Sequence, residues 1–315
     1  MNLTRSRLLV QSLSFGILTY GGRFGLNLGH ALPCLSCPYV NGCGGHCFLM
    51  ALQGSFWGVQ ASLSALAGPR GLETLRMLAL FILLALQLSK LWCGWICPFG
   101  TLQDALTWVR SRLGIPEARW SWATSDRLRW VKYIFLLLLL AIPLMIANLG
   151  LHGDYGLPFC QICPAKPLMP LFTGDTAHLA IDTTNAITTA MTVLSLLLAG
   201  GFLAGMFFRE RFFCIFCPML ALLGLVQRFG LVRFTKNVNA CVGCGSCARS
   251  CPLEIRTVRA ELVKRDVMSP ECMACMTCAD SCAHDGSLSF HWLKWRIFAS
   301  SAVGAARRFR KGLFS

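Results

Sequence analysis

Two cysteine runs near the C-terminus constrain this chain more than any other feature. The first reads Cys-x2-Cys-x2-Cys-x3-Cys-Pro from Cys241 to Pro252, and the second repeats the 2-2-3 spacing from Cys272 to Cys282. Three closely spaced cysteines can wrap one cubane cluster, while the fourth of each run reaches across to the other cluster. A zinc ribbon also uses Cys-x2-Cys pairs, but it does not explain two tandem quartets of the same spacing. We therefore predict two [4Fe–4S] clusters, one held by Cys241, Cys244, Cys247 and Cys282, the other by Cys272, Cys275, Cys278 and Cys251.

The rest of the chain has the composition of a membrane protein. Of its 315 residues, 55% are hydrophobic and only 14% are charged. A formal net charge of +15 is compatible with nucleic-acid binding, but the apolar bulk favours basic residues that mark the cytoplasmic side of a membrane, so no nucleic-acid partner is expected. Iron-bound thiolates need a reducing compartment, which places the cluster segment in the cytoplasm.

Four segments are apolar enough to cross a bilayer, which takes about 20 residues per helix. The N-terminal segment is interpreted as an uncleaved anchor, because no cleavage site follows it convincingly. Basic residues gather between the second and third segments and after the fourth, so the positive-inside rule predicts a multi-pass protein of the bacterial inner membrane with both termini in the cytoplasm. The segments are Leu8–Tyr20, Leu75–Trp92, Ile134–Leu149 and Ala186–Phe208.

The ten remaining cysteines suggest an internal duplication. Cys34/Cys37 and Cys160/Cys163 lie in stretches expected outside, and Cys93/Cys97 and Cys214/Cys217 follow the second and fourth segments. Each pair ends in Cys-Pro, and proline suits the first turn of a following helix, whose N-terminus would stabilise an anionic cluster. Two copies in the same orientation imply a pseudo-twofold axis along the membrane normal, so each face would collect four thiolates.

These two quartets have different predicted chemistry. The inner one, of Cys93, Cys97, Cys214 and Cys217, is expected to hold a metal or redox centre. The outer one, of Cys34, Cys37, Cys160 and Cys163, could hold a further iron–sulfur cluster or form disulfides, because the periplasm is oxidising. Cys43 and Cys47 have no counterpart in the second copy; they could pair with each other or add ligands to the outer centre. A bilayer about 30 Å thick would separate the two faces, which makes a quinone or another subunit a candidate bridge.

The predicted fold is an all-α membrane bundle followed by a small α+β domain of the two-cluster bacterial ferredoxin type. Its four transmembrane helices form two tandem two-helix repeats, over residues 1–128 and 129–232. The ferredoxin domain covers 233–288, and a basic amphipathic tail over 289–315, with Trp292 and Trp295, is expected to lie as a helix on the lipid surface. No haem is predicted, because no histidine lies mid-span and no Cys-x-x-Cys-His is present.

The stretch Trp92-Cys93-Gly94-Trp95-Ile96-Cys97-Pro98, its partner Cys214-Ile215-Phe216-Cys217-Pro218 and the following cluster motifs resemble the membrane polyferredoxins. This family includes NapH, NosR, CcoG and MauN. The resemblance implies an inner-membrane protein that handles electrons for a periplasmic redox enzyme, with quinol oxidation as the role proposed for NapH-like proteins. Two departures are the Cys-x2-Cys spacing of the second inner pair and the six outer cysteines, which suggest an outward electron exit or a thiol relay.

Three functions are compatible with these features. The first is electron transfer between the quinone pool or a cytoplasmic donor and a periplasmic oxidoreductase or partner subunit. The second is an assembly factor that reduces a metal or a thiol needed by another metalloenzyme. The third is a transmembrane thiol–disulfide conduit, in which Cys34/Cys37 and Cys160/Cys163 exchange disulfides. No bond-making catalytic residues stand out.

Overall fold

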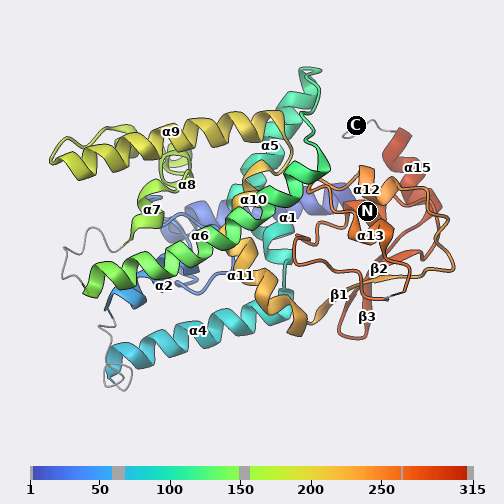
Figure 1. Ribbon diagram of the computed structural model, residues 1–315, viewed down its shortest axis with the longest axis horizontal. Coiled ribbons are helices and arrows are strands. Elements are labelled where there is room, and N and C mark those ends of the chain that lie inside the picture. The colour runs from blue at the N-terminus through green and yellow to red at the C-terminus, as the bar shows by residue number, and fades with distance from the viewer. Residues whose placement is uncertain (1–2, 59–67, 149–156, 264, 311–315) are drawn as a thin grey trace.

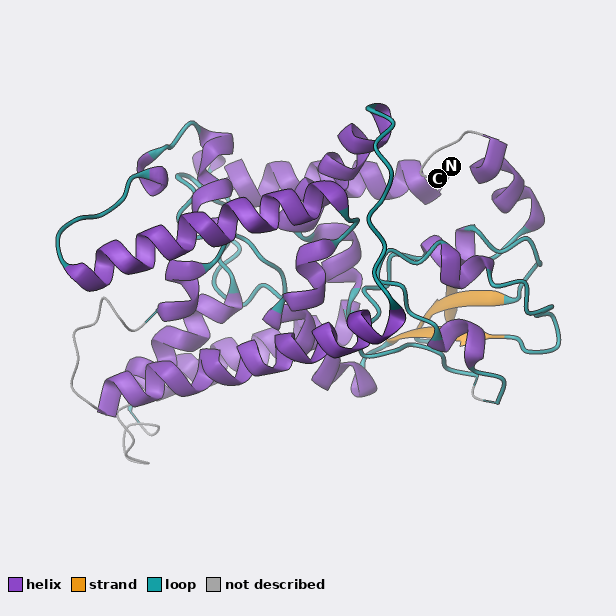
Figure 2. Ribbon diagram, turned by 45° about the horizontal axis from the view of Figure 1, so that its top comes forward, coloured by secondary structure: helices purple, strands orange, loops and turns teal. Residues whose placement is uncertain are grey.

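The structure is a computed structural model that describes residues 3–58, 68–148, 157–263 and 265–310. Long helices lie side by side over most of the molecule, and a small domain with a β-sheet caps one end (Figures 1 and 2). The longer helices are α1 (Leu3–Tyr20), α2 (Phe48–Gly58), α4 (Pro69–Leu88), α5 (Pro98–Arg112), α6 (Trp122–Asn148), α9 (Ala186–Phe208), α11 (Pro218–Val226) and α15 (Ala302–Arg310). The short ones are α7 (Pro158–Ile162), α8 (Ala165–Leu168), α10 (Phe212–Phe216), α12 (Ser246–Arg249), α13 (Thr257–Ala260) and α14 (Thr277–Asp280).

Three described helices are long and apolar enough to cross a membrane: Gly71–Leu88 in α4, Ala123–Ile146 in α6 and Ala186–Phe208 in α9. The predicted span Leu8–Tyr20 does lie in a helix, α1, but that helix is not one of the three, so the count of four is not confirmed. The predicted span Leu75–Trp92 ends earlier, at Leu88, because Ser89 takes a positive φ of 47°. Leu149, the expected end of the third span, lies outside the described residues.

The C-terminal domain is built on an antiparallel sheet of three strands in the order β1 (Val232–Lys236), β2 (Leu288–Trp292) and β3 (Trp295–Ala299). Phe234 of β1 stacks on Phe290 of β2 with ring centroids 4.1 Å apart, and both side chains are fully buried. The expected helical tail is therefore wrong over residues 289–299. Burial of Phe290 draws this segment into the sheet, and a helix, α15, begins only at Ala302.

Ion pairs fasten this domain to the helices. Lys132 of α6, which is fully buried, pairs with Glu271 beside Cys272. Arg209, just after α9, pairs with Glu254 at 2.9 Å. Lys90 donates hydrogen bonds to the backbone carbonyls of Ser269 and Pro270. These contacts hold the second cysteine run against the ends of the membrane helices.

Candidate metal centres

The structure brings the predicted ferredoxin ligands together in two groups. In the first, the thiols of Cys241 and Cys282 lie near Cys247, whose pKa is raised by burial and then by repulsion from these two. Cys244, the fourth predicted ligand, is exposed, and a backbone N–H from Ser246 lowers its pKa. In the second group, burial and then the nearby Cys275, Cys272 and Cys251 raise the pKa of Cys278. Thiols that repel one another in this way are the donor set that a cationic iron centre would relieve.

The inner quartet also converges at one place. Cys97 and Cys217 immediately precede the first residues of α5 and α11, which are Pro98 and Pro218, as the sequence predicts. Cys93 lies in one π-helical turn over Trp92–Ile96. Burial raises the pKa of Cys217, and repulsion from Cys214, Cys93 and Cys97 adds to the increase. The four thiols therefore share one buried site at the ferredoxin end of the bundle.

A buried cation lies beside this inner quartet. The Arg211 side chain is fully buried; its Nη1 donates to the Cys93 carbonyl at 3.2 Å. Its Nε and Nη2 donate to the two carboxylate oxygens of Asp104, at 2.7 and 2.6 Å. A cluster held by four thiolates would be anionic. The buried guanidinium of Arg211, which contacts the Cys93 carbonyl, would stabilise that negative charge.

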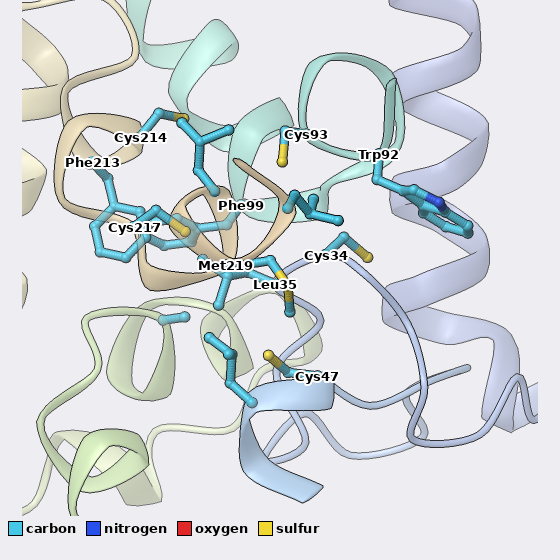
Figure 3. Packing of buried hydrophobic residues seen from close by; sticks show 14 of the residues in the cluster. Cys34, Leu35, Cys47, Trp92, Cys93, Phe99, Phe213, Cys214, Cys217 and Met219 are labelled. Carbon is cyan, nitrogen blue, oxygen red and sulfur yellow. The ribbon is translucent and has the colours of Figure 1, made fainter. Parts of the chain in front are cut away.

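The six outer cysteines do not gather as the predicted quartet. Cys37, Cys47, Cys160 and Cys163 line one small cavity. Cys34 instead lies between Cys47 and Cys93 (Figure 3), and after burial its pKa is raised most by the nearby Cys97. The Cys43 sulfur is 3.5 Å from Nδ1 of His46. The outer loop thus folds inward, and its thiols are buried between the helices rather than spread over a membrane face.

Two glutamines contact these centres in the same way, and the sequence analysis missed both. Gln103 Nε2 lies 3.5 Å from the Cys214 sulfur, and its Oε1 accepts the Phe213 N–H at 3.0 Å. Gln53 Nε2 lies 3.4 Å from the Cys160 sulfur, and its Oε1 accepts the Phe159 N–H at 3.1 Å. The signal that would have found them is a shared pattern, Cys-Gly-x-x-Cys-x4-Leu-Gln, from Cys43 to Gln53 and again from Cys93 to Gln103.

The second ferredoxin group touches the inner quartet through Gly94. A Cβ atom at this position would lie 2.4 Å from the Met273 carbonyl oxygen and 3.2 Å from the Cys275 nitrogen, so only glycine permits this approach. The neighbouring Trp95 donates its Nε1–H to the Ala274 carbonyl at 3.1 Å. A ligand loop of one centre is therefore in backbone contact with a ligand loop of the next.

A cavity of about 440 Å³ opens beside this contact, between α1 and α5. Its polar groups include Asp104, which accepts hydrogen bonds at 2.6 Å from both Arg7 and Gln11. Glu210 lies on the wall, where burial and then the Asp104 charge raise its pKa to about 7. Apolar side chains complete the lining, among them Leu3, Leu8 and Trp108, and Cys275 forms part of it.

Among the described residues, no three His, Cys, Asp or Glu side chains lie close enough together to hold a single metal ion. A cubane places one thiolate on each of its iron atoms, so its ligands stand further apart than those of one zinc ion. The predicted sets of four thiols have the composition that such a cluster requires.

Comparison with known proteins agrees with this chemistry. A family model described as a 4Fe-4S binding domain matches residues 71–116 and again 191–237, and a 4Fe-4S dicluster domain matches 233–283. The first model thus covers both inner cysteine pairs, and the second covers all eight predicted ferredoxin ligands. No solved structure matches the chain.

Several curated proteins are similar over most of this chain. The putative electron transport protein YccM of Escherichia coli is 28% identical over 217 residues, which are 68% of this chain but only 54% of YccM. An uncharacterized protein of Methanocaldococcus jannaschii is 27% identical over 223 residues, 70% of this chain and 79% of that protein. The ferredoxin-type protein NapH of Haemophilus influenzae is 27% identical over 229 residues, 70% of this chain and 69% of NapH. The homologues and the two family models therefore support a membrane polyferredoxin-type family for this chain and, with it, iron–sulfur electron transfer.

Proposed function

We propose that this chain carries electrons across the bacterial inner membrane, between a donor at its ferredoxin end and a redox enzyme on the periplasmic side. When bound, iron–sulfur clusters supply one-electron oxidation and reduction. The chain's own residues hold them in sequence. The single observation that carries the proposal is the contact of Gly94 with Met273 and Cys275, which joins the second ferredoxin group to the inner quartet without an intervening side chain.

The distribution of charged residues supports this orientation of the chain in the membrane. The end of the bundle that holds the ferredoxin domain also carries basic residues, among them Arg110, Arg129 and Arg209. The stretch between α6 and α9 has Asp154, Asp175 and Asp182 with only one lysine, Lys166. By the positive-inside rule, the ferredoxin end then faces the cytoplasm.

The cavity beside Cys275 suits a quinol as the electron donor. A mostly apolar chamber with a few convergent polar groups is the usual form of a small-molecule site, and this one lies where α1 meets the inner interface. A quinol releases two protons with its two electrons. Asp104 is held as a carboxylate by Arg7 and Arg211, whereas Glu210, with a pKa of about 7, is placed to accept a proton.

The test is electron transfer into a sealed vesicle. The full chain is purified without oxygen and reconstituted into liposomes that contain cytochrome c, and dithionite is added outside. We expect reduction of the trapped cytochrome at a rate at least tenfold above protein-free vesicles. The Cys93→Ser/Cys217→Ser variant should fall to the protein-free rate while it retains about eight irons in its ferredoxin domain.

Two results would contradict the proposal. One is equal cytochrome reduction by the double variant and the unaltered chain, because the inner quartet would then not lie on the route. The other is a fully iron-loaded chain that reduces no trapped cytochrome. A Ser246→Ala chain, altered only at the exposed first group, controls for general damage to the clusters.

A further inference from the structure

We infer that the outer cavity is a second membrane-embedded [4Fe–4S] site, whose four ligands are Cys37, Cys47, Cys160 and Cys163, and that it is built as a structural copy of the inner site. This inference rests on the proposed function and extends it, because it supplies the next centre along the route. It also assigns different ligands from the quartet that chain doubling predicts, since Cys34 is replaced by Cys47.

The local structure of the inner site is repeated at the outer cavity. Cys97 precedes α5, and Gln103 on that helix reaches Cys214 and the Phe213 N–H. Cys47 likewise precedes α2, and Gln53 on that helix reaches Cys160 and the Phe159 N–H. Both glutamines also return a hydrogen bond to their own helix, at Phe99 and Leu49, and both are buried. Two buried amides that each bridge a cysteine sulfur and the preceding backbone N–H are not required by helix packing.

The glycine that follows the first cysteine of each pattern has a matching role. A Cβ on Gly94 would collide with the Met273 carbonyl, and one on Gly44 would lie 2.2 Å from the Ile17 carbonyl of α1. Helix α1 also touches both segments: Arg7 donates to the Gly94 carbonyl at 3.1 Å, and the Gly44 N–H donates to the Leu18 carbonyl at 3.0 Å. From Arg7 to Leu18 is about three helical turns, or roughly 16 Å. The two sites are therefore spaced by about half the bilayer core.

The cavity also holds a suitable donor set. Cys37, Cys47, Cys160 and Cys163 all line it, and all four side chains are buried. Cys47 and Cys163 accept backbone N–H groups from the turn that follows them, Leu49 and Met50 for one and Ala165 and Lys166 for the other. Four buried thiols around one cavity, with N–H donors directed at two of them, are suited to iron bound as thiolates.

The sequence pattern alone would choose Cys43, the counterpart of Cys93, as the fourth ligand. The structure assigns Cys37 instead, because Cys37 lines the cavity whereas the Cys43 sulfur lies against His46. Cys34 is also excluded, because it does not line the cavity and lies between Cys47 and Cys93 (Figure 3). Cys43 and Cys34 are therefore matched controls for the four assigned ligands.

The experiment is a count of iron and acid-labile sulfide in the full chain purified without oxygen, with Mössbauer spectra to identify the cluster type. Four [4Fe–4S] centres correspond to about sixteen irons per chain. We expect each of Cys37→Ser, Cys47→Ser, Cys160→Ser and Cys163→Ser to remove about four of these irons, while Cys43→Ser and Cys34→Ser remove none. Alkylation followed by mass spectrometry should find the four cavity thiols protected in the loaded chain and free after iron is chelated.

The outcomes separate this inference from the proposed function. Loss of four irons from Cys43→Ser but none from Cys37→Ser would overturn the ligand assignment. A disulfide among the cavity cysteines, or about twelve irons in the unaltered chain with no change in these variants, would overturn the outer cluster and leave the inner route intact. A loss of only two irons per variant would replace the tetranuclear cluster by a binuclear one. If a Ser variant does not accumulate, the alkylation pattern of the unaltered chain still decides.

Discussion

At the scale of single residues, Gln53 and Gln103 are placed to tune the candidate centres whose cysteines they contact. Each amide directs an N–H at a sulfur, at 3.4 Å for Gln53 and 3.5 Å for Gln103. A hydrogen bond to a ligand sulfur stabilises the more negative, reduced state of a cluster and so raises its reduction potential. Because each amide touches one site only, its effect can be isolated.

We predict that Gln53→Leu lowers the potential of the outer centre only, and Gln103→Leu that of the inner centre only. Leucine keeps most of the buried volume but leaves the sulfur and the backbone N–H of the preceding phenylalanine without this partner. Potentiometric titration followed by electron paramagnetic resonance measures both centres in one sample, so each variant controls for the other. Equal shifts of all centres in either variant would show a general loss of structure instead.

A second residue-scale prediction concerns pH. The raised pKa of Glu210, about 7, leaves its carboxyl protonated below neutral pH and able to accept a proton only above it. Quinol oxidation should therefore rise with pH through about 7. Glu210→Gln should flatten this profile and lower the rate at high pH by on the order of 100-fold. The exposed Glu73→Gln serves as the control, and an unchanged profile in Glu210→Gln would remove this residue from proton transfer.

At the scale of elements, the ferredoxin domain is held to the bundle by few but buried contacts. Lys132 of α6 is fully buried, and Glu271 precedes the first ligand of the second cysteine run. Removing one partner of such a pair leaves an uncompensated charge away from water, which costs more than the pair itself contributes. The position of Cys272–Cys275 against Gly94 therefore depends on an ion pair made by the residue immediately before Cys272.

We predict that Glu271→Gln lowers the free energy of unfolding by about 3 kcal/mol and loosens the domain contact. The double variant Lys132→Met/Glu271→Leu should recover part of this loss, because no charge is then left unpaired. Thermal unfolding in nanodiscs, followed by tryptophan fluorescence, measures the effect. Glu73→Gln breaks an exposed pair with Arg76 and should change stability by less than about 0.5 kcal/mol. A double variant no better than Glu271→Gln would contradict the charge argument.

At the scale of the whole molecule, the charge distribution and the position of the ferredoxin domain predict one topology. Alkaline phosphatase, which is active only in the periplasm, should be active when fused after Thr183, in the stretch that precedes α9. It should be inactive when fused after Gly114, just beyond the end of α5. The reverse pattern would invert the direction of every electron path proposed above.

How much of this could be predicted from the sequence depends on how local the signal is. Short cysteine spacings predict the two ferredoxin groups and the family resemblance, because ligand geometry is encoded within a few residues. The prolines after Cys97 and Cys217 likewise predict the helices that begin there. The strands β2 and β3 are not predicted from the sequence because Trp292, Trp295 and Arg296 resemble part of an amphipathic tail, and only the packing of Phe290 on Phe234 shows otherwise. The ligands proposed for the outer site differ from the predicted quartet because a comparison of Cys-Pro pairs does not include the Cys-Gly-x-x-Cys pattern, in which Phe48 stands at the position of the proline.

Exposure of Cys244 has a practical consequence for anyone who handles the protein. It is the one exposed cysteine among the eighteen, and its sulfur is already favoured as a thiolate by the Ser246 N–H. Thiolates open to solvent are the first to be oxidised, whereas the sulfurs packed between helices are shielded. In a preparation exposed briefly to air, the cluster that Cys244 helps to bind should therefore be oxidised first. Such a sample should lose iron from this cluster before it loses iron from the buried sites.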